Sequence, residues 1–195
     1  MRIISGKYKG RRISPPKNLP VRPTTDMSKE ALFNVLRNHF DFSGLKVLDL
    51  FSGTGNISYE FASRGSDNIT CVDGDMGCVK FIKQTATEFD FNIVAIKSDV
   101  LKYIERCKAK YDIIFADPPY ALDQKTFEKI VLSIFEQNLL EDAGMMIIEH
   151  SKYTKLDHII HFSFKKSYGG SIFSFFEIKG DVDEEVDQSN EGEEE

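Results

Sequence analysis

The sequence predicts an α/β fold with a mostly parallel β-sheet and helices on both of its faces. Short apolar runs rich in β-branched and aromatic residues alternate with longer amphipathic stretches, which is the order expected of strand–helix–strand units. The last two apolar runs meet at Gly169-Gly170 without an intervening helix, which predicts a C-terminal antiparallel hairpin. A chain of 195 residues is long enough for one such domain.

The first forty residues are predicted to form an extension ahead of this domain. Residues 2–14 alternate like a short hairpin, with Gly6 and Gly10 at turn or bulge positions. Four prolines between residues 15 and 23 then predict an extended linker.

The remaining elements follow in order. Thr24 or Thr25 suits the N-cap of a helix over 26–39. Strands are predicted over 46–50, 68–73, 94–97, 111–117, 145–150, 159–168 and 171–178, and further helices over 56–64, 77–89, 101–108 and 125–138. The organisation is therefore an N-terminal extension over 1–40, an α/β domain over 41–180 and an acidic tail over 181–195.

Charge is strongly segregated along the chain. Residues 181–195 hold nine acids and no Lys or Arg, so we expect this tail to be disordered. Residues 1–40 hold nine Lys or Arg and two acids, a pattern typical of a surface that contacts nucleic-acid phosphates. The candidate residues for such phosphate contacts are Lys7, Lys9, Arg11, Arg12 and Arg22. A solvated basic face with no partner is the alternative.

Several classes of protein are disfavoured. No apolar run approaches the ~20 residues of a membrane span, and the N-terminus lacks an apolar signal core. The three cysteines, Cys71, Cys78 and Cys107, lack paired ligand spacing and are expected to be reduced thiols. His158 and His161 lie in a strand-like stretch and do not indicate a metal site. We therefore expect a cytoplasmic monomer without a membrane partner or metal.

A glycine-rich loop follows the first predicted strand, and in a parallel sheet ligands bind beyond the carboxyl ends of the strands. Gly53 and Gly55 allow the backbone to turn sharply and approach a ligand. A dinucleotide site would need a third glycine where Ser58 stands, and the carboxylate of Asp49 would repel a pyrophosphate. That carboxylate attracts a cation instead. The ligand that combines adenosine with a cationic amino-acid part is S-adenosylmethionine.

Acids also follow the next two strands. Asp73 is placed to accept hydrogens from both ribose hydroxyls, with Asp75 as the second choice. At the third strand, Asp99 can accept the adenine amine hydrogen and a backbone N–H near Val100 can meet a ring nitrogen. Any one of these acids could instead be a helix N-cap. Acids at four successive strand ends fit a binding edge better.

The fourth strand ends in Asp117-Pro118-Pro119-Tyr120. A carboxylate, a stiff double proline and an aromatic ring suit a pocket that holds a flat amine-bearing group, such as a nucleobase, by stacking and by accepting its N–H hydrogens. A purely structural turn is the alternative.

These motifs resemble those of a known family. The loop from Asp49 to Asn56 is similar to the glycine-rich motif of Rossmann-type methyltransferases, and Asp117–Tyr120 to their amine-methylating signature. The N-terminal part of the chain is more specific, because it closely resembles the RsmD family, and the resemblance extends over about residues 2–178. The motifs that carry it are Ile3-Ile4-Ser5-Gly6, Lys9-Gly10-Arg11, Arg22-Pro23-Thr24-Thr25-Asp26 and Glu30-Ala31-Leu32-Phe33-Asn34. The chain departs from the family's pattern at two places. Met27 stands where the family usually has a basic residue, and Asp73-Gly74-Asp75 matches the family's acid-containing strand end only loosely.

The resemblance implies a Rossmann-like class I methyltransferase with a seven-stranded sheet. It implies methyl transfer from S-adenosylmethionine to the exocyclic N2 amine of a guanine in 16S rRNA, as free RNA or within a ribosomal subunit. The cofactor-binding residues are then Asp49, Phe51, Gly53, Gly55, Asn56, Asp73, Asp75, Asp99, Val100 and Thr25, and the catalytic residues are Asp117, Pro118, Pro119 and Tyr120. Asp117 and the Pro118 carbonyl accept the amine hydrogens, and Tyr120 stacks on the base.

Three rival functions remain. An adenine-N6 methyltransferase acting on DNA or RNA would use the same Asp-Pro-Pro-Tyr chemistry. A non-catalytic RNA-binding module would not need that motif. A dehydrogenase is disfavoured by Ser58 and by the acid before the loop.

Overall fold

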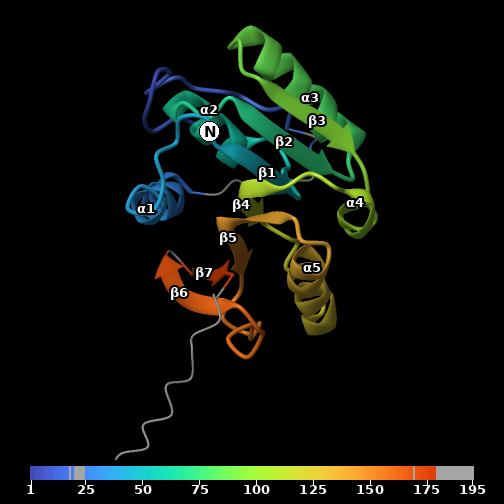
Figure 1. Cartoon of the computed structure of the whole chain (residues 1–195). Coiled ribbons are helices and arrows are strands. Elements are labelled where there is room, and N and C mark those ends of the chain that lie inside the picture. The colour runs from blue at the N-terminus through green and yellow to red at the C-terminus, as the bar shows by residue number, and fades with distance from the viewer. Residues whose placement is uncertain (18, 20–24, 169, 179–195) are drawn as a thin grey trace, which may run out of the picture.

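The structure is a computed structural model that describes residues 1–17, 19, 25–168 and 170–178. Its elements follow the predicted order (Figure 1). The helices are α1 (Asp26–Leu36), α2 (Asn56–Arg64), α3 (Met76–Glu88), α4 (Val100–Arg106) and α5 (Gln124–Glu136), and the strands are β1 (Lys46–Leu50), β2 (Asn68–Asp73), β3 (Ile93–Lys97), β4 (Tyr111–Ala116), β5 (Leu140–His150), β6 (Phe162–Tyr168) and β7 (Ser171–Glu177). The predicted α/β class and the seven strands are confirmed. The predicted disordered tail, Arg22 and Thr24 lie outside the described residues.

The seven strands form one sheet in the order β3-β2-β1-β4-β5-β7-β6. The first five strands of this order are parallel, and β7 pairs antiparallel with both β5 and β6. The direction of chain progression reverses between β1 and β4, where Leu50 pairs with Ala116. In a sheet of this kind the crevice for ligands lies at the carboxyl ends of the strands on either side of that reversal.

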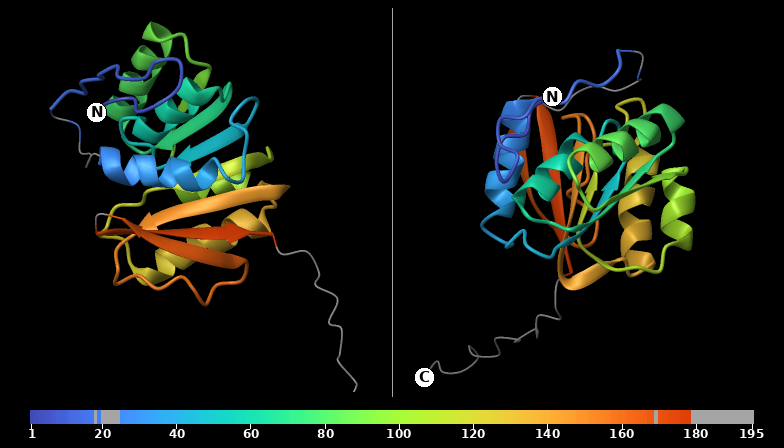
Figure 2. Two further views of the ribbon diagram at one scale, coloured as in Figure 1. Left: turned by 90° about the vertical axis from the view of Figure 1, so that its left-hand side faces the viewer. Right: turned by 90° about the horizontal axis from the view of Figure 1, so that it is seen from above.

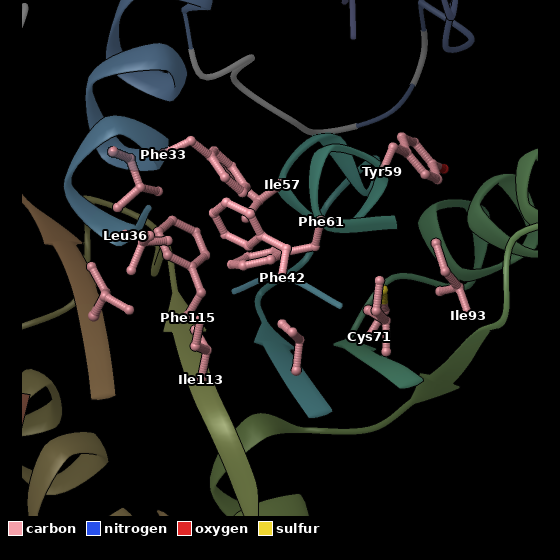
Figure 3. Packing of buried hydrophobic residues seen from close by; sticks show 14 of the residues in the cluster. Phe33, Leu36, Phe42, Ile57, Tyr59, Phe61, Cys71, Ile93, Ile113 and Phe115 are labelled. Atoms are coloured by element: carbon pink, nitrogen blue, oxygen red, sulfur yellow. The ribbon is translucent and has the colours of Figure 1, made fainter. Parts of the chain in front are cut away.

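Helices cover both faces of the sheet (Figure 2). Buried side chains of α1, α2 and α3 join one core cluster, and those of α4 and α5 join a second. Side chains alternate along each strand, so Ile113 and Phe115 of β4 face the first cluster while Ile114 faces the second. Figure 3 shows the aromatic centre of the first cluster, where the ring centroids of Phe33 and Phe61 lie 4.7 Å apart. These rings pack α1 against α2 in the first cluster.

Two strand boundaries differ from the prediction by more than one residue. β5 starts at Leu140, five residues earlier than expected. β6 starts at Phe162 rather than at residue 159, because Ile159 accepts a turn hydrogen bond from the Phe162 N–H at 3.1 Å. Ile159 is apolar because it packs in the second core cluster, not because it belongs to a strand. Among the described residues no helix is long and apolar enough to span a membrane.

The N-terminal arm (residues 1–17) is a loop that packs on the body of the protein. Its two ends pair as the predicted short hairpin: Arg2 and Arg12 form an antiparallel bridge, the Ile3 N–H donates to the Arg11 carbonyl at 2.9 Å and the Ile13 N–H to the Met1 carbonyl at 3.0 Å. The arm contacts α2 closely at Gly6, whose φ is +81° and where a Cβ would lie 1.8 Å from the Ser63 carbonyl oxygen. The next residue, Lys7, donates its backbone N–H to the same oxygen at 2.7 Å. Only glycine fits this contact.

A buried ion pair joins α1 to α2. Lys29 Nζ lies 3.3 Å from Glu60 Oε2, and both side chains are almost fully buried. Glu60 also accepts from the backbone N–H groups of Ile4 and Ser5 at 2.9 and 3.0 Å and from Arg64 Nε at 3.0 Å. Desolvation lowers the pKa of Lys29, and the charge of Glu60 opposes that effect. The Glu60 carboxylate thus binds groups of the N-terminal arm, α1 and α2.

Candidate active site

A cavity of about 540 Å³ lies beyond the carboxyl ends of the parallel strands. Its walls come from the loops after β1, β2, β3 and β4, from α1 and from the ends of β5 and β7. The lining residues are Thr25, Ser28, Asp49, Phe51, Ser52, Gly53, Thr54, Asn56, Ile57, Asp73, Gly74, Asp75, Cys78, Ser98, Asp99, Val100, Phe115, Asp117, Pro118, Pro119, Tyr120, Glu149 and Ser171. Every predicted catalytic residue and every predicted cofactor residue except Gly55 lies in this set.

The loop between β1 and α2 reverses direction through residues with positive φ. Phe51, Gly53 and Gly55 have φ values of 57°, 52° and 80°. At Gly55 a Cβ would lie 2.8 Å from the ring of Tyr59, so this position requires glycine even though it does not line the cavity. Phe51 adopts the left-handed conformation as a non-glycine residue, at a cost on the order of 1–3 kcal/mol, and its side chain lines the cavity.

Asp73 holds the glycine loop in place. The Gly53 N–H donates to its Oδ2 at 2.7 Å and the Asp75 N–H to its Oδ1 at 2.8 Å. A carboxylate oxygen can accept more than one hydrogen, so these bonds leave Asp73 able to accept from a ligand hydroxyl. Asp73 therefore connects the loop after β1 to the strand end where an adenosine ribose is expected.

Asp75 and Asp99 are helix N-caps as well as wall residues. Asp75 Oδ1 accepts from the Cys78 N–H at 2.9 Å, and Asp99 Oδ1 accepts from the Lys102 N–H at 3.0 Å. The capping interpretation is thus correct for both acids. The N-cap of α1 is Thr25, whose hydroxyl accepts from the Ser28 N–H at 3.1 Å.

Asp49 is the most buried carboxylate among the predicted cofactor residues, with 2% of its surface exposed. The Ser58 hydroxyl donates to its Oδ2 at 2.5 Å. Burial raises the pKa of Asp49 to about 7, with the Ser58 hydrogen bond opposing this effect and the charge of Asp73 adding to it. A cation bound beside Asp49 would restore the ionised form, so the site gains free energy from a positively charged ligand group.

The acceptor end of the cavity is built from Asp117, Pro118, Pro119 and Tyr120. The Asp117 N–H donates to the Leu50 carbonyl at 3.3 Å, which fixes the end of β4 against β1. Pro118 is buried, whereas the ring of Tyr120 is 44% exposed and its hydroxyl lies 3.1 Å from the Ser171 hydroxyl. A half-exposed ring beside a buried proline corner leaves a planar group a face on which to stack.

Two wall residues at this end were not predicted. Ser171 comes to the cavity because β7 pairs with β5, a long-range contact that local sequence patterns do not indicate. Glu149 is an acid near the carboxyl end of β5 and lines the cavity. An acid at a strand end is the sequence signal that identified Asp49 and Asp73, and the same signal in this strand would have identified Glu149.

The candidate RNA-binding residues lie apart from this cavity. Lys7, Lys9, Arg11 and Arg12 are exposed on the N-terminal arm and do not line it. Within the described ranges, no group of three or more His, Cys, Asp or Glu side chains is arranged to hold a metal ion.

The sheet order and the position of the cavity define a Rossmann-like class I methyltransferase fold. A hypothetical protein from Thermus thermophilus shares this fold, with a TM-score of 0.79 at 24% identity over 91% of this chain and 99% of that one. The N2 G1207 methyltransferase of 16S rRNA from T. thermophilus, solved with AdoMet and guanosine, has a TM-score of 0.65 at 19% identity, covering 82% of this chain and 45% of that one.

Sequence comparison identifies the family. Residues 1–177 match the family model described as conserved hypothetical protein 95. Ribosomal RNA small subunit methyltransferase D of Escherichia coli K12 is 30% identical over 156 residues, which cover 80% of this chain and 74% of that protein. The chain belongs to this family, and its predicted membership of the RsmD family is confirmed.

Proposed function

We propose that this protein transfers a methyl group from S-adenosylmethionine to the exocyclic N2 amine of a guanine in 16S rRNA. One observation carries the proposal: Asp117–Tyr120 and the acids Asp49, Asp73 and Asp99 line the same cavity. One site therefore offers acids that complement a donor with a cationic amino-acid part and, beside them, residues that complement a flat amine acceptor. Two comparisons support this donor and this acceptor. The E. coli relative is named a ribosomal RNA small subunit methyltransferase, and the T. thermophilus enzyme was solved with AdoMet and guanosine.

The residues present fit this cofactor. Asp49 would face the cationic amino-acid part, Asp73 the ribose hydroxyls, and Asp99 with the Val100 backbone the adenine. When bound, the cofactor supplies an electrophilic methyl group on a sulfonium. Thr25, Phe51 and Asn56 complete the wall around it.

The protein's catalytic contribution lies at the acceptor amine. The guanine amine is a poor nucleophile because its lone pair is delocalised into the ring, and it becomes cationic as a fourth bond forms. The carboxylate of Asp117 and the Pro118 carbonyl would accept its two hydrogens and stabilise that charge. Pro118 and Pro119 restrict the backbone so that little reorganisation is needed, and Tyr120 would stack on the base after it leaves its own stack. The proton leaves after transfer, to Asp117 or to water.

The N-terminal arm would hold the phosphate backbone of the RNA. Lys7, Lys9, Arg11 and Arg12 present positive charge at the surface of the arm, which packs on α2, and α2 begins at the cofactor loop. Arg22 is assigned to the same role from the sequence. We propose that the protein acts as a monomer, with small-subunit rRNA as its partner.

The decisive experiment is mass spectrometry of 16S rRNA from a strain that lacks this protein. We expect one N2-methylguanine to disappear and to return when purified protein and S-adenosylmethionine are added to rRNA or small subunits from that strain. Loss of an N6-methyladenine instead would overturn the proposal in favour of the rival adenine methyltransferase. Comparing free rRNA with assembled subunits in the same assay identifies the substrate form.

A further inference from the structure

Glu149 lies in the cavity wall beside Asp117. β4 and β5 pair in parallel register, with Phe115 opposite Ile147, so the next residues on the same face of each strand are Asp117 and Glu149. Both line the cavity, and the backbones of neighbouring strands lie about 4.8 Å apart. Two carboxylates therefore border the place where the acceptor amine is expected.

The position of Glu149 departs from the pattern of its strand. The preceding residues on its face, Met145 and Ile147, are buried in the first core cluster. Glu149 is 5% exposed and continues that row, but it does so where the row reaches the cavity. A carboxylate is costly to bury, and an apolar side chain would continue the row at lower cost. A role toward a ligand accounts for an acid at this point.

The two candidate bases differ in the group that adjoins the target amine. In guanine the ring nitrogen N1 beside the N2 amine carries a hydrogen, whereas in adenine the N1 beside the N6 amine carries a lone pair. A second acceptor next to Asp117 would accept the guanine N1–H and would face the adenine lone pair with repulsion. Asp117 alone does not distinguish these bases, because each offers it an amine hydrogen.

We propose that Glu149 accepts the N1–H of the target guanine and thereby selects guanine over bases with an unprotonated N1. This inference rests on the proposed function and adds to it the residue that determines base specificity. A site built to bond a donor rejects an analogue that lacks it, because the buried acceptor is then left without its partner.

The test uses RNA in which the methylated guanine is replaced by 2-aminopurine, which keeps the amine but has an unprotonated N1. We expect the wild-type protein to prefer guanine strongly in kcat/KM. In Glu149→Gln the amide can donate to the bare N1, so the preference should fall by about 10- to 100-fold. The absent O6 of 2-aminopurine affects both proteins equally and cancels in this comparison.

A second variant and a control separate recognition from folding. Glu149→Met should fold, since apolar residues precede it on its row, and should lose activity on guanine without gaining any on 2-aminopurine. Glu141→Gln, on the same strand but outside the cavity, should keep the wild-type preference. S-adenosylmethionine affinity should stay within about twofold in all three variants, because Glu149 faces the acceptor.

Three outcomes overturn the inference. An unchanged preference in Glu149→Gln, with an active wild-type protein, would remove Glu149 from base recognition and leave the proposed function intact. An equal loss on both substrates with weakened cofactor binding would show a structural role. No N2 transfer to guanine by the wild-type protein would overturn the proposed function itself and this inference with it.

Discussion

Lys29 Nζ lies 2.9 Å from Oδ1 of Asn56, the residue that opens α2 in the cavity wall. The same ammonium donates to the Arg2 carbonyl at 2.6 Å. Lys29 belongs to α1, so a single buried group connects the N-terminal arm, α1 and the cofactor loop. Glu60, the ion-pair partner of Lys29, is buried as well, so this connection lies inside the protein and not at its surface.

Glu60→Gln should destabilise the protein by about 3–5 kcal/mol, because removing one partner leaves the buried charge of Lys29 uncompensated. Urea unfolding measures the change. The control is Glu141→Gln, which removes an exposed pair with Lys46 at 3.9 Å and should cost less than about 1 kcal/mol. Equal losses in the two variants would contradict the importance of the buried pair.

Cofactor affinity should rise with pH through Asp49. Burial raises the pKa of Asp49 to about 7, so at pH 5.5 the empty site is mostly protonated and must lose a proton to hold a cation. We expect roughly tenfold tighter binding at pH 7 than at pH 5.5, measured by calorimetry. Asp49→Asn should bind weakly with a flatter pH profile. A wild-type profile as flat as that of the variant would argue against this pairing.

The same group affects folding stability with a definite sign. Well below pH 3.8, the ordinary pKa of an Asp carboxyl, Asp49 is protonated in both states, and its neutral form is compatible with the fold. As the pH rises toward 7 the unfolded chain gains from ionisation while the folded chain does not. The stability difference between Asp49→Asn and the wild-type protein should therefore shift in favour of the variant between pH 4 and pH 7, as chemical denaturation can show.

Asp117→Asn should lower kcat by at least about 100-fold and leave cofactor affinity unchanged, since the lost carboxylate acts on the developing charge of the acceptor. Single-turnover methyl transfer and equilibrium binding separate the two quantities. Asp123→Asn is the matched control, because Asp123 caps α5 outside the cavity and asparagine is an equally good N-cap. Substantial transfer by Asp117→Asn would show that another group is the main acceptor.

Neutralising Lys9 and Arg11 together should weaken RNA binding and reduce its salt dependence by roughly 1.5 to 2 units of slope, since each phosphate contact releases counterions. Cofactor affinity should not change. The control double variant replaces Lys125 and Lys129, exposed on α5 at the opposite face of the sheet. An identical slope in both double variants would exclude the N-terminal arm as the phosphate contact.

The features that sequence predicted well are local ones. A strand end, a glycine turn and an N-cap are each specified by a few consecutive residues, so β1, α2 and the acids Asp73 and Asp99 were located correctly. Asp75 and Asp99 cap helices, which is the alternative that the sequence offered for them, and both side chains also line the cavity.

The features that sequence did not predict depend on distant contacts. Lys29 and Glu60 are 31 positions apart, and charged residues are rarely buried, so the sequence alone does not indicate a buried ion pair between them. Ser171 reaches the cavity only through the antiparallel pairing of β7 with β5. The position of the N-terminal arm on α2 depends on the contact of Gly6 with Ser63, which the local pairing of the arm's own residues does not indicate.

The close contact at Gly6 has a geometric consequence for substrate choice. α2 meets the arm near its C-terminal end at Ser63 and meets the cofactor loop at its first residue, Asn56. At 1.5 Å per residue these ends are about 11 Å apart. If the arm holds the RNA backbone as proposed, this helix sets a fixed spacing between the gripped phosphates and the nucleotide that reaches Asp117. The length of α2 would then help decide which guanine in a folded RNA can be methylated.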